Sequence, residues 1–386
     1  MTERCDVLVV GAGPAGWRRR RRPRRTARGS RWSTCRPTRA DRCGGATRAG
    51  APDPARERLD ALLAGARVRW LGQAQVVAAE PGQALVEQAG TAIELSYGAL
   101  VLATGARELL LPFPGWTSPG VTGAGGLQAL VKQGWPIAGR RVLVAGSGPL
   151  LLAAAATAQR HGARVVAICE QAPAARLHAF ARRLWRWPGK LAQAAALRAR
   201  LAGAPYRAGR WIVAAHGEGR VAEAELNDGE RIAVDQLAVG YGLVPNLELA
   251  QQLGCELQAH GAHACVRVDA LLRTSVASVY AAGEACGIGG RDCALVEGAM
   301  AGHAAAGAVE AARAAAAARG RAFAARCCRN TSGSIRGSWP RRRRTPWYAA
   351  ARTCASARST PRRLARGKLA TRCGMGGCQA ASAAPR

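Results

Sequence analysis

Three glycines, Gly11, Gly13 and Gly16, follow an apolar run that ends at Val10, and their spacing is G-x-G-x-x-G with Pro14 inside it. In such a turn the first glycine permits a tight bend, the second lets a pyrophosphate approach the backbone, and the third lets a helix pack against the strand. The phosphates then lie on free N–H groups at the helix N-terminus. The spacing therefore predicts a dinucleotide site near the start of the chain.

A second glycine turn contains Gly146 and Gly148 and lies between an apolar strand and an apolar helix. The next strand ends at Glu170, so this segment is a complete βαβ unit. Glu170 would accept a hydrogen bond from a ribose 2′-hydroxyl and would favour NAD over NADP. Leu151 stands where a third Gly or Ala is expected, and we expect it to hold helix and strand apart. Two interpretations stay open: an NAD(P) site, or a scaffold that binds no nucleotide or a different one.

Further candidates for chemistry come in pairs along the sequence: Thr104 with Gly105, Gly283 with Glu284, and Cys373 with Cys378. The first two pairs end short apolar strands, and the cysteines form a C-x4-C motif. The six histidines form no cluster, and no Ser/His/Asp arrangement or metal-ligand spacing is visible. The sequence therefore predicts no particular catalytic base.

The elements that would position these residues alternate between helices and strands. Helical spacing covers 56–66 and 176–201, and the small residues of 294–319 predict another helix. Residues 206–240 resemble a β-meander with a hairpin turn at 227–229. This alternation predicts an α/β protein.

The formal net charge is +32 over 386 residues, but it is unevenly distributed. Residues 17–50 and 326–386 together supply 27 of these 32 charges, and the second segment has no acidic residue. The rest of the chain has the charge balance of an ordinary globular protein. The arginine runs would bind phosphate backbones non-specifically and lack the interleaved aromatics of a stacking platform. We therefore expect no specific nucleic-acid partner.

Targeting and redox features are consistent with a cytoplasmic protein. The apolar run at Val7 has no basic region before it, and no window approaches the roughly 20 apolar residues of a membrane span. The thirteen cysteines are an odd number and are scattered, which is not typical of a disulfide framework. We expect most of them, including Cys169, Cys255, Cys286 and Cys293, to be small buried apolar residues.

Five motifs in order carry a family resemblance: GAGPAG at 11–16, LVLATGARE at 100–108, GSGP at 146–149, GYGLVPN at 240–246 and VYAAGEACGIGG at 279–290. This order resembles the flavoproteins of the pyridine nucleotide–disulfide oxidoreductase superfamily, which have two dinucleotide domains. More narrowly, it is similar to the FAD-binding alpha-type subunits of the opine oxidase, hydroxyproline dehydrogenase and cyanide synthase group. The resemblance covers roughly 1–16 and 51–325.

The resemblance implies roles for the candidate residues. The first glycine turn would hold the FAD pyrophosphate, Thr104 and Gly105 would pass under the flavin, and Glu284 would bind the ribityl chain. Glu284 stands where an Asp is expected, so its carboxylate is one methylene further out. The second turn would hold NAD(P). Because no C-x4-C pair follows the first glycine turn, disulfide reductase activity is not expected.

The resemblance also implies the domain organisation. We expect two Rossmann-like dinucleotide-binding domains, the second inserted in the first. The FAD-binding domain would comprise 1–135 and 265–325, with 17–50 aberrant, and the NAD(P)-binding-like domain would comprise 136–264. Residues 326–386 would be an aberrant tail with the remnant of a cysteine module.

Residues 17–50 lack the strand and terminal acid that such flavoproteins place about 20 residues after the first turn. We interpret this segment as a slipped reading frame. Rebuilding each codon from the third base of one residue and the first two bases of the next turns Thr26–Arg48 into approximately HGARVAVVD-L-x-AD-x-GGQVWR. That string supplies the missing strand and acid. A genuine arginine-rich insertion is the alternative, and resequencing the coding DNA distinguishes the two.

The same frame rule recovers a cysteine module near the C-terminus. Applied to Thr345–Ser356 it gives about T-(L/V)-VCRCEDVRL, which places a C-x-C motif before the C-x4-C of Cys373 and Cys378. Four such thiolates resemble the [2Fe–2S] module that ends many of these subunits. As the chain is written, only Cys373 and Cys378 remain as candidate ligands.

The function expected from this resemblance is electron transfer through FAD. The parent enzyme would oxidise an amine, imino-acid or opine C–N bond, and its partner would be a second flavoprotein subunit. Four alternatives stay open: an NAD(P)H-dependent flavin reductase, a non-catalytic structural subunit, an arginine-rich nucleic-acid binder, and a chain that as written forms no competent FAD site.

Overall fold

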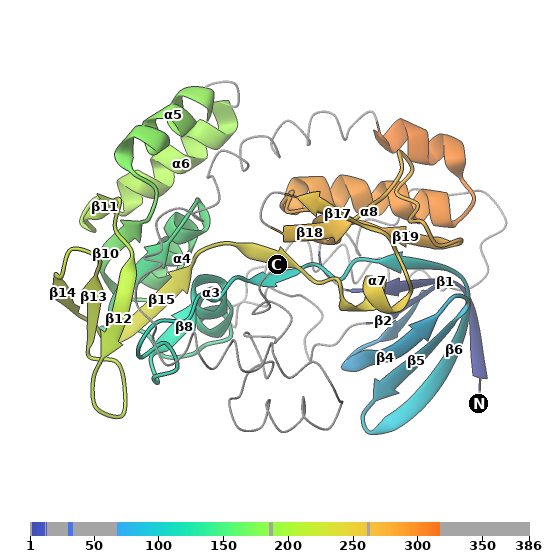
Figure 1. The fold of residues 1–386 in the computed structure, drawn as a ribbon, viewed down its shortest axis with the longest axis horizontal. Helices are drawn as coiled ribbons and strands as arrows, with labels where there is room; N and C mark the ends of the chain where they lie inside the picture. Colours follow the sequence, from blue (N-terminus) through green and yellow to red (C-terminus); the bar gives the residue numbers. More distant parts are fainter. Residues whose placement is uncertain are drawn as a thin grey trace.

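The computed structural model describes residues 2–11, 13, 30–33, 68–184, 188–260 and 263–316. These residues form two lobes, each built on a parallel sheet (Figure 1). The arginine-rich segments 17–50 and 326–386 lie outside the described residues, except for Ser30–Ser33. The proposed cysteine module therefore also lies outside them.

In the first lobe the sheet order is β3-β2-β1-β6-β5-β4, with β19 beside β6. Strands β3, β2, β1, β6 and β19 run parallel to their neighbours, and β4, β5 and the first part of β6 form an antiparallel meander. Their bounds are β1 Thr2–Val10, β2 Ser30–Ser33, β3 Val68–Leu71, β4 Ala74–Glu80, β5 Gln83–Gln88, β6 Thr91–Leu102 and β19 Val279–Ala281. The central strand β1 ends at the first glycine turn.

The two faces of this sheet are buried separately, because successive side chains of a strand alternate between faces. Val7 and Val9 pack with helix α8 (Arg291–Ala305) on one face. Leu8 and Val10 pack with the meander and with helix α7 (Glu248–Gln252) on the other. Near-continuous apolar runs such as Val7–Val10 are typical of strands covered on both faces.

The second lobe repeats this plan with the sheet order β11-β10-β9-β15-β8. These strands are parallel, and their bounds are β8 Val121–Gly123, β9 Arg141–Gly146, β10 Arg164–Glu170, β11 Tyr206–Ala208 and β15 Gln236–Gly240. Helices α3 (Ala124–Lys132) and α4 (Leu150–Arg160) share a buried core with β9 on one face. The antiparallel strands β12 (Ile212–His216), β13 (Glu223–Leu226) and β14 (Arg231–Ala233) share a core with Leu143 and Ala145 on the other.

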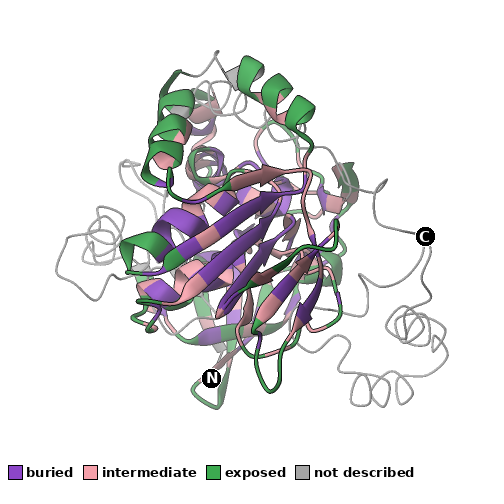
Figure 2. Ribbon diagram, turned by 90° about the vertical axis from the view of Figure 1, so that its left-hand side faces the viewer, coloured by how far each residue is buried: buried purple, intermediate pink, exposed green. Residues whose placement is uncertain are grey.

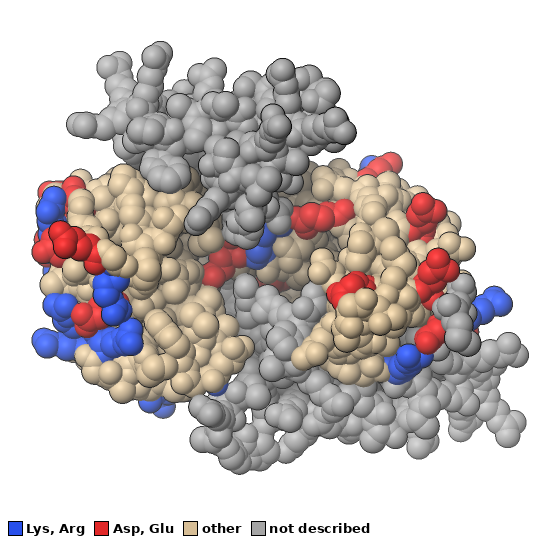
Figure 3. All heavy atoms as spheres, turned by 90° about the horizontal axis from the view of Figure 1, so that it is seen from below, with Lys and Arg blue, Asp and Glu red and all other residues tan. Residues whose placement is uncertain are grey.

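Two further helices, α5 (Ala174–Leu184) and α6 (Pro188–Arg200), extend from the second lobe. Most of their described residues are exposed, whereas the strands of the sheet are buried (Figure 2). Acidic and basic side chains are intermixed on this lobe (Figure 3), consistent with its ion pairs Arg207–Glu230 and Arg210–Asp228. Within the described residues no helix is both long and apolar enough to cross a membrane.

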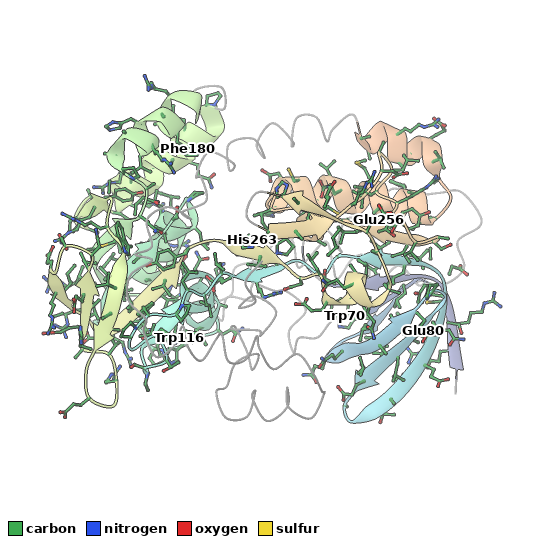
Figure 4. All side chains as sticks on the ribbon, in the orientation of Figure 1. Trp70, Glu80, Trp116, Phe180, Glu256 and His263 are labelled. Atoms are coloured by element: carbon green, nitrogen blue, oxygen red, sulfur yellow. The ribbon has the colours of Figure 1, made fainter. Side chains whose placement is uncertain are left out.

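A two-stranded ribbon connects the lobes where the chain passes from one to the other. Strand β7 (Ala106–Glu108) leaves the first lobe and pairs antiparallel with β16 (Leu243–Pro245), which returns to it. After β16, α7 and the hairpin β17 (Leu257–His260) and β18 (His263–Val266) lie with the first sheet. Figure 4 shows Trp70 in the first lobe, Trp116 in the second, and His263 at the start of β18, on the side of the first lobe that faces the second.

Three sequence expectations need correction at this level. Strand β8 and helix α3 join the second sheet, and α7 joins the first core, so we place both lobe boundaries at the β7–β16 ribbon rather than at 135 and 264. The crossing was missed because 111–126 is rich in Pro and Gly and shows no period. The expected meander over 206–240 is also shorter, since β11 and β15 pair in parallel with β10 and β9.

The third correction concerns the arginine-rich segment, which contributes a strand after all. β2 lies between β1 and β3 and pairs with both, with Val7 opposite Ser30 and Val10 opposite Ser33. These are the four positions at which the alternative frame gives Val-Ala-Val-Val. An inner parallel strand is normally apolar, so the backbone position fits the alternative frame better than the Ser-Arg-Trp-Ser present. Thr34, where that frame has its acid, lies outside the described residues.

Candidate functional site

The first glycine turn begins where the paired strands β1 and β6 end. The Ala103 N–H donates to the Val10 carbonyl at 2.8 Å. Gly11 has φ +111°, and a Cβ there would lie 2.1 Å from the Ala103 carbonyl oxygen, so only glycine fits. A Cβ on Gly13 would meet none of the described residues within 4 Å, so they leave open space over its backbone. Pro14 and Gly16 lie outside the described residues.

Thr104 and Gly105 follow this close approach and belong to the connection between the lobes. The Thr104 hydroxyl donates to the Asn246 carbonyl at 2.8 Å, and the Asn246 side-chain amide donates to the Thr104 carbonyl at 2.9 Å. The Asn246 N–H also donates to the Gly105 carbonyl at 3.0 Å, and Gly105 has φ +70°. The Thr104 hydroxyl therefore fixes the connection, and no separate ligand contact is needed to explain it.

Arg107 and Glu108 extend this connection in opposite directions. Arg107 donates to the Asn246 side-chain oxygen at 3.1 Å and to Glu248 at 2.8 Å. Glu108 accepts from the N–H groups of Gly125 and Gly126 at 2.6 and 3.0 Å, which caps the N-terminus of α3. Sequence reasoning missed both residues, although they directly follow the Thr-Gly motif.

Gly283 and Glu284 begin the short 3₁₀ helix η1 (Gly283–Cys286), directly after β19. Gly283 has φ +76°, and its N–H donates to Glu297 at 3.0 Å. Glu297 lies on α8 and is only 1% exposed. The buried carboxylate thus fixes the turn that carries Glu284, which is half-buried. Glu297 was also missed, and the signal was an acid in the middle of a mostly apolar helix.

The second glycine turn repeats the geometry of the first. Gly146 has φ +147°, and a Cβ there would lie 2.1 Å from the Gly240 carbonyl oxygen. The Ser147 N–H donates to the same carbonyl at 2.9 Å. A Cβ on Gly148, which has φ +96°, would meet nothing within 4 Å. Both turns therefore combine one glycine in close backbone contact with one glycine under open space.

Glu170 lies beside this turn, as the βαβ unit predicted, and is only 1% exposed. Its carboxylate accepts from the N–H of Gly148 at 2.8 Å and from that of Ala172 at 3.1 Å. The Tyr206 hydroxyl donates to it at 3.4 Å. Burial, and then the charge of Glu170, raise the pKa of Tyr206, so the hydroxyl stays a donor. A ribose hydroxyl bound here would donate to the same Glu170 carboxylate that already accepts from the Gly148 N–H.

Leu151 packs between helix α4 and the second sheet. It is completely buried in the core between α4 and the sheet. A Cβ on Gly240 would lie 3.7 Å from Leu151 Cδ2 and 2.9 Å from the Ala124 Cβ. A side chain at Gly240 would therefore crowd Ala124, whereas its contact with Leu151 would be of ordinary length.

The cysteines of the described residues are unsuited to redox chemistry. Those six are free and buried, and they include Cys169, Cys255, Cys286 and Cys293, as expected. Burial raises the pKa of Cys5 to about 11 and that of Cys169 to about 12, so both stay thiols at neutral pH. No group of three or more His, Cys, Asp or Glu that could hold a metal occurs in this part of the chain. Cys373 and Cys378 lie outside it.

Comparison with known proteins gives one family match that covers most of the chain. The family model described as pyridine nucleotide-disulphide oxidoreductase matches residues 5–318. Hydrogen cyanide synthase subunit HcnB of Pseudomonas aeruginosa is 32% identical over 234 residues, which are 56% of this chain and 50% of that protein. An opine oxidase subunit of Rhizobium meliloti is 34% identical over 219 residues, which are 52% of this chain and 47% of that protein. The chain spans about half the length of these relatives.

Among solved structures, the thioredoxin reductase of T. acidophilum has the same fold. It is 18% identical with a TM-score of 0.58, and the match covers 80% of this chain and 98% of that one. At this identity the likeness concerns the fold alone. It supports the arrangement of two dinucleotide-binding lobes.

Proposed function

Since the chain belongs to the pyridine nucleotide-disulphide oxidoreductase family, we propose that it is the FAD-carrying, electron-transferring subunit of a dehydrogenase or oxidase that acts on an amine, imino acid or opine. The family consists of FAD-dependent oxidoreductases that use FAD with NAD(P). The observation that carries the proposal is the first turn, where a glycine with no room for a Cβ is followed by one under open space.

The described residues fit FAD at this turn. The space over Gly13 is where a pyrophosphate would approach the backbone. Glu284 would hold hydroxyls of the ribityl chain, and Glu297 keeps its turn in place through the Gly283 N–H. When bound, FAD would supply the group that accepts a hydride or two electrons. The protein supplies position: Gly11 and Ala103 set the turn, and Thr104 with Asn246 sets the connection beside it.

The subunit role and substrate class are supported by the relatives. Both of those named above are described as subunits, one of a cyanide synthase and one of an opine oxidase. We infer that a second flavoprotein subunit completes the enzyme and provides the oxidation site for the substrate.

Anaerobic reduction of the bound flavin tests this proposal. The FAD-loaded chain, alone and with the candidate partner subunit, is mixed with an opine, L-proline, hydroxyproline or glycine. We expect one of these donors to bleach the flavin absorbance band at about 450 nm. Bound flavin that none of the donors reduces would instead indicate a non-catalytic structural subunit.

A second candidate function, an NAD(P)H-dependent flavin reductase, is favoured by the second turn. Gly148 has the same open space as Gly13, and Glu170 lies at its side. In this case NADH alone would bleach the flavin in anaerobic stopped flow. Reduction by NADH but by no amine or imino acid would favour this candidate over the first.

A further inference from the structure

Two polar side chains at the second glycine turn lack hydrogen-bond partners although they are buried. Gln171 is 5% exposed, and both its amide oxygen and its amide nitrogen are buried without a partner in the described part of the chain. The Ser147 hydroxyl oxygen is likewise buried without a hydrogen-bond partner in this part of the chain. Buried polar groups are nearly always paired, so each exception needs an explanation.

One of these residues belongs to the turn, and the other lies beside it. Ser147 stands between its two glycines, and its N–H donates to the Gly240 carbonyl at 2.9 Å. The Gln171 N–H donates to the Gly146 carbonyl at 2.8 Å, which fixes Gln171 directly beside the turn and next to Glu170. The unpaired groups thus lie at the carboxyl edge of the parallel strands, where α/β sheets bind ligands.

The chemistry of these groups matches parts of an adenine dinucleotide. A glutamine amide offers one acceptor and two donors in one plane, and it can pair with an adenine edge through the exocyclic N6–H and a ring nitrogen. A serine hydroxyl can donate to a phosphate oxygen. The open space over Gly148, the residue after Ser147, leaves room for that phosphate at the turn.

We propose that Gln171 recognises the adenine base of a dinucleotide bound at the second turn, and that Ser147 donates to its pyrophosphate. Glu170 holds the turn between them through the Gly148 N–H. Since both amide atoms of Gln171 are covered, the base reaches them after neighbouring residues shift. This inference rests on the second turn holding a dinucleotide and is independent of the substrate that reduces the flavin.

The test compares NAD⁺ with 1,N6-etheno-NAD⁺, in which a bridge removes the N6 hydrogens and blocks N1. Affinities for both are measured by titration calorimetry on the FAD-loaded wild type and on Gln171→Leu. We expect the wild type to bind NAD⁺ about 10-fold more tightly than the etheno analogue, as one good amide–adenine pair allows. In Gln171→Leu, the ratio of the two affinities should fall to about one.

Gln236→Leu is the matched control. Gln236 is completely buried and its side-chain oxygen also lacks a partner, but it begins β15, at the end of the strand away from Gly240. This variant should keep the wild-type ratio of affinities. In Gln171→Leu the melting temperature without NAD⁺ should be unchanged or higher, because an unpaired amide is removed.

Two results would overturn the proposal: an unchanged ratio of affinities in Gln171→Leu, or a wild type that does not bind NAD⁺. Flavin absorbance and reduction by an amine donor are recorded on the same samples. A normal flavin signal together with either result would reject the role of Gln171 and leave the proposed function intact.

Discussion

Two buried acids show how individual residues hold the candidate sites. Glu170 and Glu297 are each 1% exposed, and each accepts from the N–H of a glycine, Gly148 and Gly283 respectively. A hydrogen bond to a charged acceptor is stronger than one between neutral groups. These acids therefore anchor the two turns even before any ligand is considered, and substituting either one would affect the turn as well as the ligand.

At Gly11 and Gly13 the same substitution should have two different results. Gly11→Ala forces a Cβ to within 2.1 Å of the Ala103 carbonyl oxygen at φ +111°, so we expect a loss of about 3 kcal/mol or more in unfolding free energy. Gly13→Ala meets no atom of the described chain within 4 Å and should leave stability nearly unchanged. Urea unfolding of both variants checks this.

Flavin content provides the second readout for this pair. Gly13→Ala should lower the FAD bound per chain, because its methyl group fills the space over the backbone. Equal destabilisation by both substitutions would contradict the geometry of the turn. Full flavin content in Gly13→Ala would contradict the assignment of the pyrophosphate to it.

Asp235 should give the protein a dependence on acid pH. Its hydrogen bonds from the Arg141 side chain and N–H lower its pKa from 3.8 to about 2. A carboxylate with a lowered folded-state pKa stabilises the fold above its unfolded value and loses this contribution as the pH falls from about 4 to about 2. Since the Asp235 side chain is 36% exposed, we expect less than about 1 kcal/mol.

The unfolding free energies of the wild type and Asp235→Asn, measured between about pH 6 and pH 3, test this contribution. The difference between them should be largest above pH 4 and should shrink toward pH 3. A difference that stays constant over this range would show that the ion pair does not act through the Asp235 charge.

At the scale of elements, the β7–β16 ribbon is what links the two lobes. Asn246 bonds to Thr104 through its N–H-bearing side chain and to Arg107 through its side-chain oxygen. Glu108, at the other end of β7, caps α3 of the second lobe. Consecutive residues of one strand therefore bond to both lobes, which sets how the two glycine turns are placed.

Asn246→Ala tests the ribbon. It removes the bonds at 2.9 Å to the Thr104 carbonyl and at 3.1 Å from Arg107. We expect a loss of about 1–2 kcal/mol in unfolding free energy, because the partners are left unpaired. We also expect the visible circular dichroism of the bound flavin to change, since Thr104 and Gly105 lie beside the first turn.

Asn227→Ala is the matched control for this prediction. Asn227 also uses both ends of its amide, accepting from the Trp211 N–H at 3.1 Å and donating to the Gly209 carbonyl at 3.4 Å, but entirely within the second lobe. It should cost comparable stability and leave the flavin spectrum unchanged. A similar spectral change in both variants would indicate general loosening instead of a role for the ribbon.

At the scale of the whole molecule, the described residues form two lobes, and the arginine-rich segment 17–50 contributes an inner strand to the first of them. β2 takes the inner position between β1 and β3, where the alternative frame has a run of apolar residues. That segment also contributes much of the +32 net charge. A slipped frame in these codons would account both for the charge of 17–50 and for the missing acid after the first turn.

A chain in which 17–50 is translated in the alternative frame should bind FAD more fully than the chain as written. The restored strand would bring an apolar inner segment and an acid for the adenosine ribose. The flavin-to-protein absorbance ratio after purification measures the gain. Equal flavin content in both chains would contradict the frame interpretation, and steep salt dependence of DNA binding by the chain as written would favour a genuine arginine-rich insertion.

The sequence by itself determined the family, the two-lobed α/β fold and the two glycine turns, because these depend on local spacing. Gly11 and Gly146 were predictable in this way, because an apolar strand followed by a glycine turn is visible within about ten residues of sequence. The burial of the cysteines was likewise predictable from their scattered placement.

Only the tertiary structure decided which distant residues complete these turns. Glu297 reaches Gly283 from another helix, and Asn246 reaches Thr104 across 142 positions. Such contacts depend on the order of the strands in a sheet, and the spacing of residues along the sequence does not determine that order. For the same reason the sequence did not show the lobe boundaries. β8 and α7 belong to a lobe through the strands and side chains that they contact, and their own sequences do not indicate which lobe that is.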